Sequence, residues 1–190
     1  MEEFVKRYNN VKEKLILFNE NSDNAKLRIK EVSTKLGVSE AELLSVQINE
    51  RLNFLAVDDF NIFFESIISN LDKLMFLIRS EFIVHEKIIN VEKLKFVNNQ
   101  IINTLDNDFP IIEFDCKRIK YVFSEIKIHN KKELRSLQFF DINGMALIKI
   151  YLKGIKKNEF DNLVESYISE YDYQIQKSEC SNSIIENNNE

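Results

Sequence analysis

Residues 134–153 read Leu-Arg-Ser-Leu-Gln-Phe-Phe-Asp-Ile-Asn-Gly-Met-Ala-Leu-Ile-Lys-Ile-Tyr-Leu-Lys, and this stretch decides the fold. Two runs of β-favouring residues flank the dipeptide Asn143-Gly144. Asn-Gly is typical of the type I′ turn in a two-residue hairpin, because both central residues of that turn need positive φ angles. The sequence therefore predicts a β-hairpin that turns at Asn143-Gly144.

This predicted turn determines which residues face each other across the hairpin. On one face the expected pairs are Ile142 with Met145, Phe139 with Ile148, and Leu137 with Ile150. That face is uniformly apolar and suits a hydrophobic core. The other face is amphipathic and carries Ser136, Gln138 and Phe140 against Tyr151, Lys149 and Leu147. We expect this second face to receive helices, a partner chain or a flat ligand.

Composition narrows the class of protein. The chain has 190 residues, enough for one domain with a sizeable core, and its net charge of −5 does not favour a nucleic-acid partner. Cys116 and Cys180 lie far apart without Cys-x-x-Cys spacing, so we do not expect a structural zinc site. No leader-like apolar run follows the first residues, and no stretch approaches the roughly 20 apolar residues of a membrane helix. We therefore expect a cytoplasmic protein with reduced thiols and no membrane insertion.

Hydrophobic periodicity predicts the remaining elements. Helices are expected over 2–20, within 25–47, from Asp58 or Asp59 to about 70, and from about 158 to 168. Strands are expected over 73–79, 82–89, 94–97, 101–105, 111–114 and 117–126, with a strand or loop at 51–57, a turn at 106–110 and a loop at 127–133. The predicted fold class is α+β, a large antiparallel β-sheet with N-terminal helices and a C-terminal helix. Residues 1–175 are expected to form a single domain, and the polar residues 176–190 a disordered tail.

The segment 29–47 has the order of a helix-turn-helix: a helix, Gly37 at the turn, Ser39 as N-cap and a second helix. A regulator that binds DNA is therefore one alternative. However, the second helix begins Ser-Glu-Ala-Glu, which would place carboxylates against phosphates and base edges. We prefer a packed helix pair that covers the sheet.

Two separated stretches resemble the HemS/ChuX family of bacterial haem-utilisation proteins. Residues 136–152 are similar to the family's repeated strand signature, and residues 79–88, Arg-Ser-Glu-Phe-Ile-Val-His-Glu-Lys-Ile, are similar to a segment in the first half of HemS-type proteins. The chain has the length of one such half. The resemblance implies a HemS/ChuX-like fold and a cytoplasmic haem-binding protein that serves haem uptake, trafficking or storage. It also implies a homodimer, as in single-half ChuX-like proteins.

The resemblance implies haem-site residues as well. Haem needs an apolar platform, cations for its two propionates and an axial ligand to iron. The candidate cations are Arg118, Lys120 and Arg135, of which Arg118 falls on an arginine of the family. The candidate iron ligands are His85, Tyr121 and His129, Tyr121 standing where relatives carry a histidine. Strand alternation places Arg118 and Tyr121 on opposite faces, so both reach one ligand only at a bulge or a rim.

Each candidate can also be explained without haem, as a strand residue that is exposed to solvent or paired with an opposite charge. The principal axial histidine of two-half relatives has no equivalent, because no histidine follows His129. A haem-degrading enzyme and a homologue that has lost haem binding therefore remain alternatives. A carrier without enzymatic activity is preferred, because the sequence shows no flavin or nicotinamide motif and no catalytic constellation.

Overall fold

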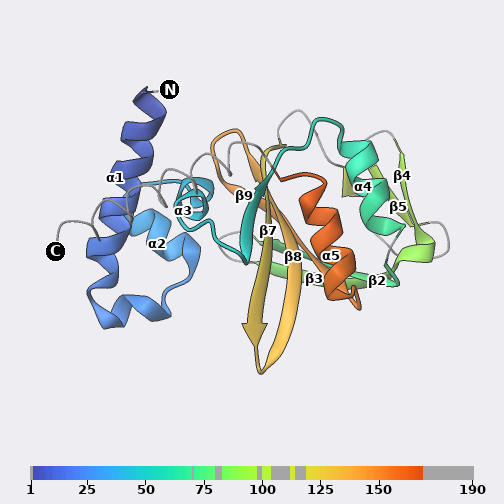
Figure 1. Ribbon diagram of the computed structural model, residues 1–190. Helices are drawn as coiled ribbons and strands as arrows, with labels where there is room; N and C mark the ends of the chain where they lie inside the picture. The colour runs from blue at the N-terminus through green and yellow to red at the C-terminus, as the bar shows by residue number, and fades with distance from the viewer. Residues whose placement is uncertain are drawn as a thin grey trace.

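The computed structural model describes residues 2–69, 71–79, 83–97, 100–103, 112–113 and 119–168. Its main feature is a six-stranded antiparallel sheet of order β1-β7-β8-β9-β2-β3 (Figure 1). The strands of this sheet are β1 Leu52–Leu55, β2 Lys73–Arg79, β3 Val84–Asn90, β7 Ile119–His129, β8 Lys132–Asp141 and β9 Ala146–Lys153. A three-stranded sheet contains β4 Leu94–Val97, β5 Gln100–Asn103 and β6 Ile112–Glu113. The predicted α+β class with a large antiparallel sheet is confirmed.

The helices form two groups (Figure 1). The N-terminal group is α1 Glu2–Asn19, the 3-10 helix η1 Ser22–Lys26, α2 Ile29–Leu36 and α3 Glu40–Ser45. The second group, α4 Phe60–Ile68 and α5 Lys157–Glu165, packs on one face of the large sheet, and the 3-10 helix η2 Val91–Lys93 precedes β4. None of the described helices has the length and hydropathy that a bilayer crossing requires.

Local chemistry explains where these helices begin and end. The Asp59 carboxylate accepts the N–H groups of Asn61 and Ile62 at 2.8 and 3.1 Å, which starts α4 as predicted. Gly37 has a φ of 66° and ends α2, because glycine adopts this left-handed conformation without steric cost. Ser39 then caps α3 by accepting the N–H of Glu42. The predicted helix, glycine turn and capped second helix are all present.

The hydrophobic core lies between the large sheet and helices α4 and α5. Phe139 pairs with Ile148 and Leu137 with Ile150, as the sequence predicts, and all four side chains are buried. Phe60 of α4 packs edge-to-face on Phe139 with ring centres 5.4 Å apart. The apolar face of the central hairpin is therefore the core face of the molecule.

The turn of this hairpin differs from the predicted type I′. Gly144 has a φ of 73°, whereas Asn143 has no positive φ. The Gly144 N–H donates to the Asp141 carbonyl at 2.9 Å, and the Asp141 N–H donates to the Met145 carbonyl at 3.0 Å. Ile142 therefore lies within the turn, and the prediction that it faces Met145 is wrong.

The physical reason is the Asp141 carboxylate. It accepts the N–H groups of Asn143 and Met145, both at 2.9 Å, and so favours a longer turn that ends in a left-handed glycine. The ladder shifts by one residue beyond this turn, so Phe140 pairs with Ala146. The predicted pairing of Phe140 with Leu147 is wrong.

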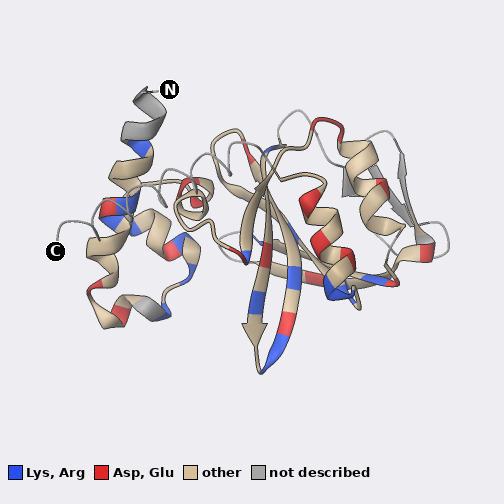
Figure 2. Cartoon of the chain, in the orientation of Figure 1, with Lys and Arg blue, Asp and Glu red and all other residues tan. Residues whose placement is uncertain are grey.

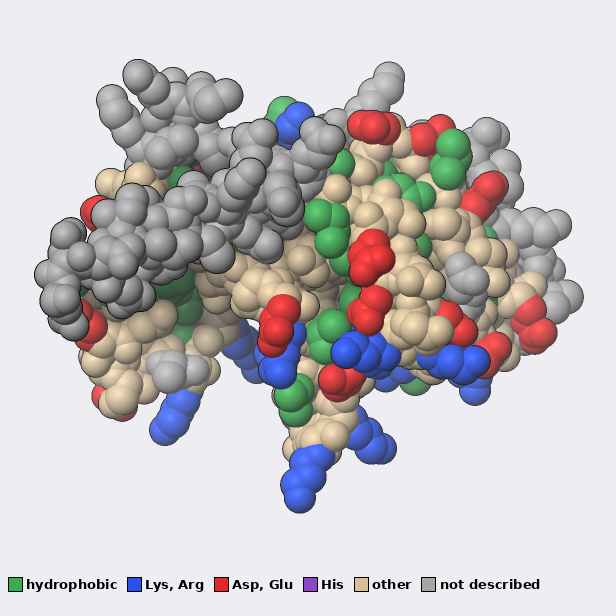
Figure 3. Space-filling view, viewed as in Figure 1, with side chains coloured by type: hydrophobic (Ala, Val, Ile, Leu, Met, Phe, Trp, Pro, Cys, Tyr) green, Lys and Arg blue, Asp and Glu red, His purple; other side chains and the backbone are tan. Residues whose placement is uncertain are grey.

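The predicted loop at 127–133 is also wrong. β7 continues to His129 and β8 begins at Lys132, because Lys127 to His129 pair across to Lys132 to Leu134. Asn130 and Lys131 have φ angles of 49° and 62°, the pattern of a two-residue type I′ turn. The resulting hairpin projects beyond the rest of the sheet, with basic side chains at its tip (Figures 2 and 3).

Several predictions lie outside the described residues. These are the turn at 106–110, both cysteines, Arg118 and the tail 176–190.

Candidate functional site

One end of the second sheet face is covered by helices α2 and α3. Ala41 and Leu44 of α3 pack with three sheet residues, Leu52, Phe123 and Phe140. The first turn of α3 is therefore buried against the sheet. It is not available to enter a DNA groove, which agrees with our preference for a packed helix pair.

The contact between α3 and the β8–β9 turn is close. The Ala41 N–H donates to the Gly144 carbonyl at 3.0 Å. A Cβ atom at residue 144 would lie 2.4 Å from Ser39 Oγ and 2.7 Å from Ser39 Cβ. Glycine is therefore needed here both for its φ angle and for the approach of the helix.

Glu40 lies at this same junction, and its residue is 7% exposed. Burial raises the pKa of its carboxyl, although the Ala146 N–H that it accepts and the charges of Lys30 and Arg79 act in the opposite direction. The carboxylate thus connects α3 to the first residue of β9 and faces a basic environment.

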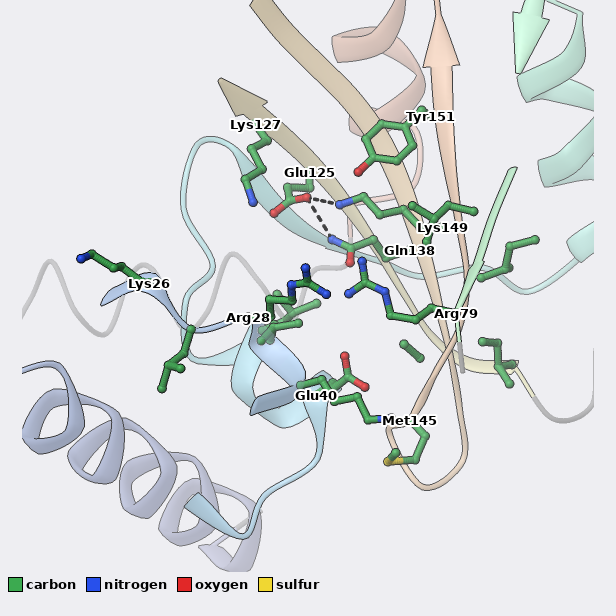
Figure 4. A pocket seen from close by; sticks show the side chains of 18 residues that line it. Lys26, Arg28, Glu40, Arg79, Glu125, Lys127, Gln138, Met145, Lys149 and Tyr151 are labelled. Carbon is green, nitrogen blue, oxygen red and sulfur yellow. Dashed lines mark hydrogen bonds and ion pairs between the residues drawn. The ribbon is translucent and has the colours of Figure 1, made fainter. Parts of the chain in front are cut away.

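A cavity of about 550 Å³ lies beside the junction, between residues 26–30 and strands β7, β8, β9 and β2 (Figure 4). Its volume is within the range of small-molecule sites. Its apolar lining includes Leu27, Ile29, Leu44, Leu77, Met145 and Leu147. Its basic lining is Lys26, Arg28, Lys30, Arg79, Lys127 and Lys149, and its acidic lining is Glu40 and Glu125. We call this cavity the basic pocket.

The basic pocket retains a surplus of positive charge. The Glu125 carboxylate accepts from Lys149 Nζ at 2.5 Å and from Gln138 Nε2 at 3.3 Å, so it is already neutralised. The guanidinium groups of Arg28 and Arg79 point toward one another (Figure 4). Among the described residues, neither has a carboxylate within ion-pair distance. The arrangement suits an anionic group held between two arginines.

Tyr151 lies on the Lys149 side of the basic pocket. Its phenol oxygen points into the pocket (Figure 4), and Lys149 Nζ lies 5.0 Å from its ring centre. Lys149 therefore contacts both an anion and an aromatic ring.

The residues predicted from the sequence lie elsewhere. His85 is exposed on the edge strand β3, and His129 is exposed at the tip of the β7–β8 hairpin. Strands β8, β9 and β2 separate β3 from β7, so the two histidines are not brought together. Tyr121 is half-buried beside Phe54, with ring centres 6.4 Å apart.

Lys120 is exposed at a β-bulge between Ile119 and Tyr121. The bulge turns Ile119 toward the core beneath α4 and α5 and Tyr121 toward the opposite cluster. Arg135 of β8 pairs with Glu133. None of the five described candidates lines the basic pocket.

Sequence reasoning did not identify the pocket residues Arg28, Glu40, Arg79 and Tyr151. The sequence contained a clue to two of these residues. Arg79 is the first residue of the family-like stretch 79–88, and Tyr151 lies on the face expected to receive a flat ligand. The sequence contained no clue to Arg28, because no local sequence pattern indicates that residues 26–30 lie over the sheet.

The sequence matches the haemin-degrading HemS/ChuX domain over residues 37–167. No curated protein matches. Among solved structures, the chain is similar to holo-PhuS, a haem-binding protein from Pseudomonas aeruginosa, with a TM-score of 0.65 and 21% identity over 86% of this chain and 46% of that one. It is also similar to the haem-degrading enzyme ChuS from Escherichia coli O157:H7, with a TM-score of 0.63 and 19% identity over 86% and 47%.

A third similar structure is the haem-binding protein ChuX, with a TM-score of 0.57 and 11% identity over 74% of this chain and 91% of that one. The chain thus spans a little under half the length of PhuS and ChuS and most of the length of ChuX. At these identities the likeness is one of fold.

Proposed function

Because the chain belongs to the HemS/ChuX domain family, we propose that it binds haem in the basic pocket. The observation that supports this proposal is the surplus of positive charge beside an apolar lining. Haem is a flat apolar macrocycle with two propionates and an iron that takes an axial ligand. A soluble site for haem must supply all three complementary features.

The residues of the basic pocket fit such a ligand. Arg28 and Arg79 would hold propionates, because their guanidinium groups face each other without a carboxylate partner among the described residues. Leu77 and Leu147 supply apolar surface, and Tyr151 and Met145 are residue types that bind haem iron. When bound, haem would supply a redox-active iron centre.

We propose a carrier role in the cytoplasm: haem uptake, trafficking or storage, with the chain acting as a homodimer. Binding and transfer need only a pocket that accepts and releases the ligand. Degradation would need electrons and oxygen as well. A reductant added to the loaded protein distinguishes the two, since loss of the haem spectrum with release of a tetrapyrrole product would identify a degrading enzyme.

Titration of the apo protein with hemin tests the proposal. The wild-type chain should give a saturable shift of the Soret band. The double variant Arg28→Ala/Arg79→Ala should bind about tenfold to a hundredfold more weakly, because it removes two charge-assisted contacts. Arg51→Ala is the matched control, because Arg51 is an exposed arginine beside Glu50 that lies outside the basic pocket. No saturable shift in the wild type, or equal affinity in the double variant, would overturn the proposal.

The haem-site residues predicted from the sequence remain predictions. The same titration tests them through Arg118→Ala, Lys120→Ala, Tyr121→Phe, His85→Ala and His129→Ala. A loss of affinity in any of these variants would extend the site beyond the basic pocket.

A further inference from the structure

Two side chains in the basic pocket belong to the types that usually hold haem iron, which are histidine, cysteine, methionine and tyrosine. They are Tyr151 and Met145. No histidine is among the described residues that line the pocket, because His85 and His129 lie on the edge strand and the hairpin tip. If the pocket holds haem, the choice of ligand among the described residues is therefore between a phenol and a thioether.

Tyr151 is held by the sheet. It pairs with Ser136 of β8 and Met75 of β2, so its backbone is fixed between two neighbouring strands. Its side chain is half-buried, and the phenol oxygen points into the pocket (Figure 4). That oxygen makes no hydrogen bond with any described residue, so it is free to take a ligand. A donor on a rigid strand is positioned more accurately than one on a loop.

Basic side chains share the pocket with Tyr151. Lys149 Nζ lies 5.0 Å from the Tyr151 ring centre, and Arg28 and Arg79 point into the same space. If Tyr151 binds haem iron, the iron would replace the phenol proton, which would leave to solvent, as for other ligands that must be deprotonated.

Met145 is less suited to the role. It follows the β8–β9 turn, is 45% exposed, and lies at the Glu40 end of the pocket, away from Lys149 (Figure 4). In haem proteins methionine typically ligates together with a histidine, and the described lining contains none.

We infer that Tyr151 is the protein ligand to iron when the basic pocket holds ferric haem, an inference that rests on the haem binding proposed above. Phenolate is a hard donor that suits the ferric state. The chain would thus bind haem without either of its histidines.

Absorption and electron paramagnetic resonance spectra of the hemin-loaded full chain test this assignment. The wild type should show a phenolate-to-iron charge-transfer band and a high-spin ferric signal. Tyr151→Phe should lose the band and shift the Soret maximum, while hemin affinity changes by no more than about tenfold because the arginines remain. Circular dichroism checks that the variant is folded.

Three control variants should keep the wild-type spectrum: Tyr121→Phe, His85→Ala and His129→Ala. Tyr151→His gives a second readout, because an imidazole at this position should produce a nitrogen-ligated spectrum in place of the phenolate band. A wild-type spectrum in Tyr151→Phe, or its loss in any control, would overturn the assignment while leaving haem binding intact. Absence of saturable binding by the wild type would instead overturn the proposed function.

Discussion

The backbone N–H of Ala41 donates to the backbone carbonyl of Gly144 at 3.0 Å and so joins the first turn of α3 to the β8–β9 turn. This hydrogen bond connects elements that are far apart along the chain. It places the α2–α3 pair, and with it residues 26–30, over the second face of the sheet. The basic pocket exists because of this docking.

Substitution of Gly144 should weaken the docking. Gly144→Ala forces a β-carbon into Ser39 and strains a residue whose φ is 73°. We expect the free energy of unfolding to fall by about 2–4 kcal/mol in urea denaturation. Gly154→Ala is the control, because Gly154 has a φ of 84° but no atom within 4 Å of the position that its β-carbon would take. That variant should lose only about 1–2 kcal/mol, and equal losses in the two variants would argue against a tight helix–turn contact.

Glu40 should make stability depend on pH. Burial raises the pKa of its carboxyl. At pH values between the ordinary glutamate pKa and this raised pKa, the folded chain therefore keeps a proton that the unfolded chain has lost. The free energy of unfolding therefore falls as pH rises through this range. Glu40→Gln has no such titration and should show a smaller decline in urea denaturation from about pH 4 to pH 8.

Glu42 lies on the same helix and provides a control, because its pKa is shifted in the opposite direction. Burial raises its pKa, but hydrogen bonds from Ser39 and the ion pair with Arg7 outweigh burial, so the net shift is downward. Its contribution to stability is present above the ordinary glutamate pKa and is lost as pH falls through the lowered value. Glu42→Gln should therefore lose stability at neutral pH. Identical pH profiles for the two variants would contradict both assignments.

Glu125 limits the positive charge of the basic pocket. Glu125→Gln releases Lys149 from its ion pair, so we expect hemin affinity to rise by about threefold to tenfold at low salt and by less at high salt. Glu133→Gln is the matched control, because Glu133 lies on the same hairpin, pairs with Arg135 and does not line this pocket. Weaker hemin binding by Glu125→Gln would show that the carboxylate itself supports the ligand.

The type I′ turn at Asn130-Lys131 should accept glycine. Lys131 has a φ of 62°, so Lys131→Gly relieves strain and should raise the free energy of unfolding by about 0.5–1 kcal/mol. Lys132→Gly, one residue later in β8, should lower it by a similar amount, because glycine weakens a strand. Destabilisation by both substitutions would contradict the turn assignment.

The core face of the central hairpin could be predicted because strand side chains alternate. Leu137 and Phe139 share a face with Ile148 and Ile150 whichever turn closes the hairpin. The turn itself was predicted incorrectly, since the Asp141 carboxylate outweighs the preference of Asn143 for positive φ. At Asn130-Lys131 the sequence signal was too weak, because lysine is not a typical type I′ residue.

The sequence by itself determined the helices, the apolar face of the sheet and, through two short stretches, the family. These features depend on neighbours along the chain, on periodicity and on capping groups such as Asp59 and Ser39. Only the tertiary structure decided that Arg28 and Arg79 point toward one another in a pocket that Tyr151 also lines. The reason is that the positions of these pocket residues depend on how the α2–α3 helix pair docks on the β8–β9 turn. The contact between Ala41 and Gly144 that fixes this docking joins residues far apart in the sequence, so no local sequence pattern predicts it.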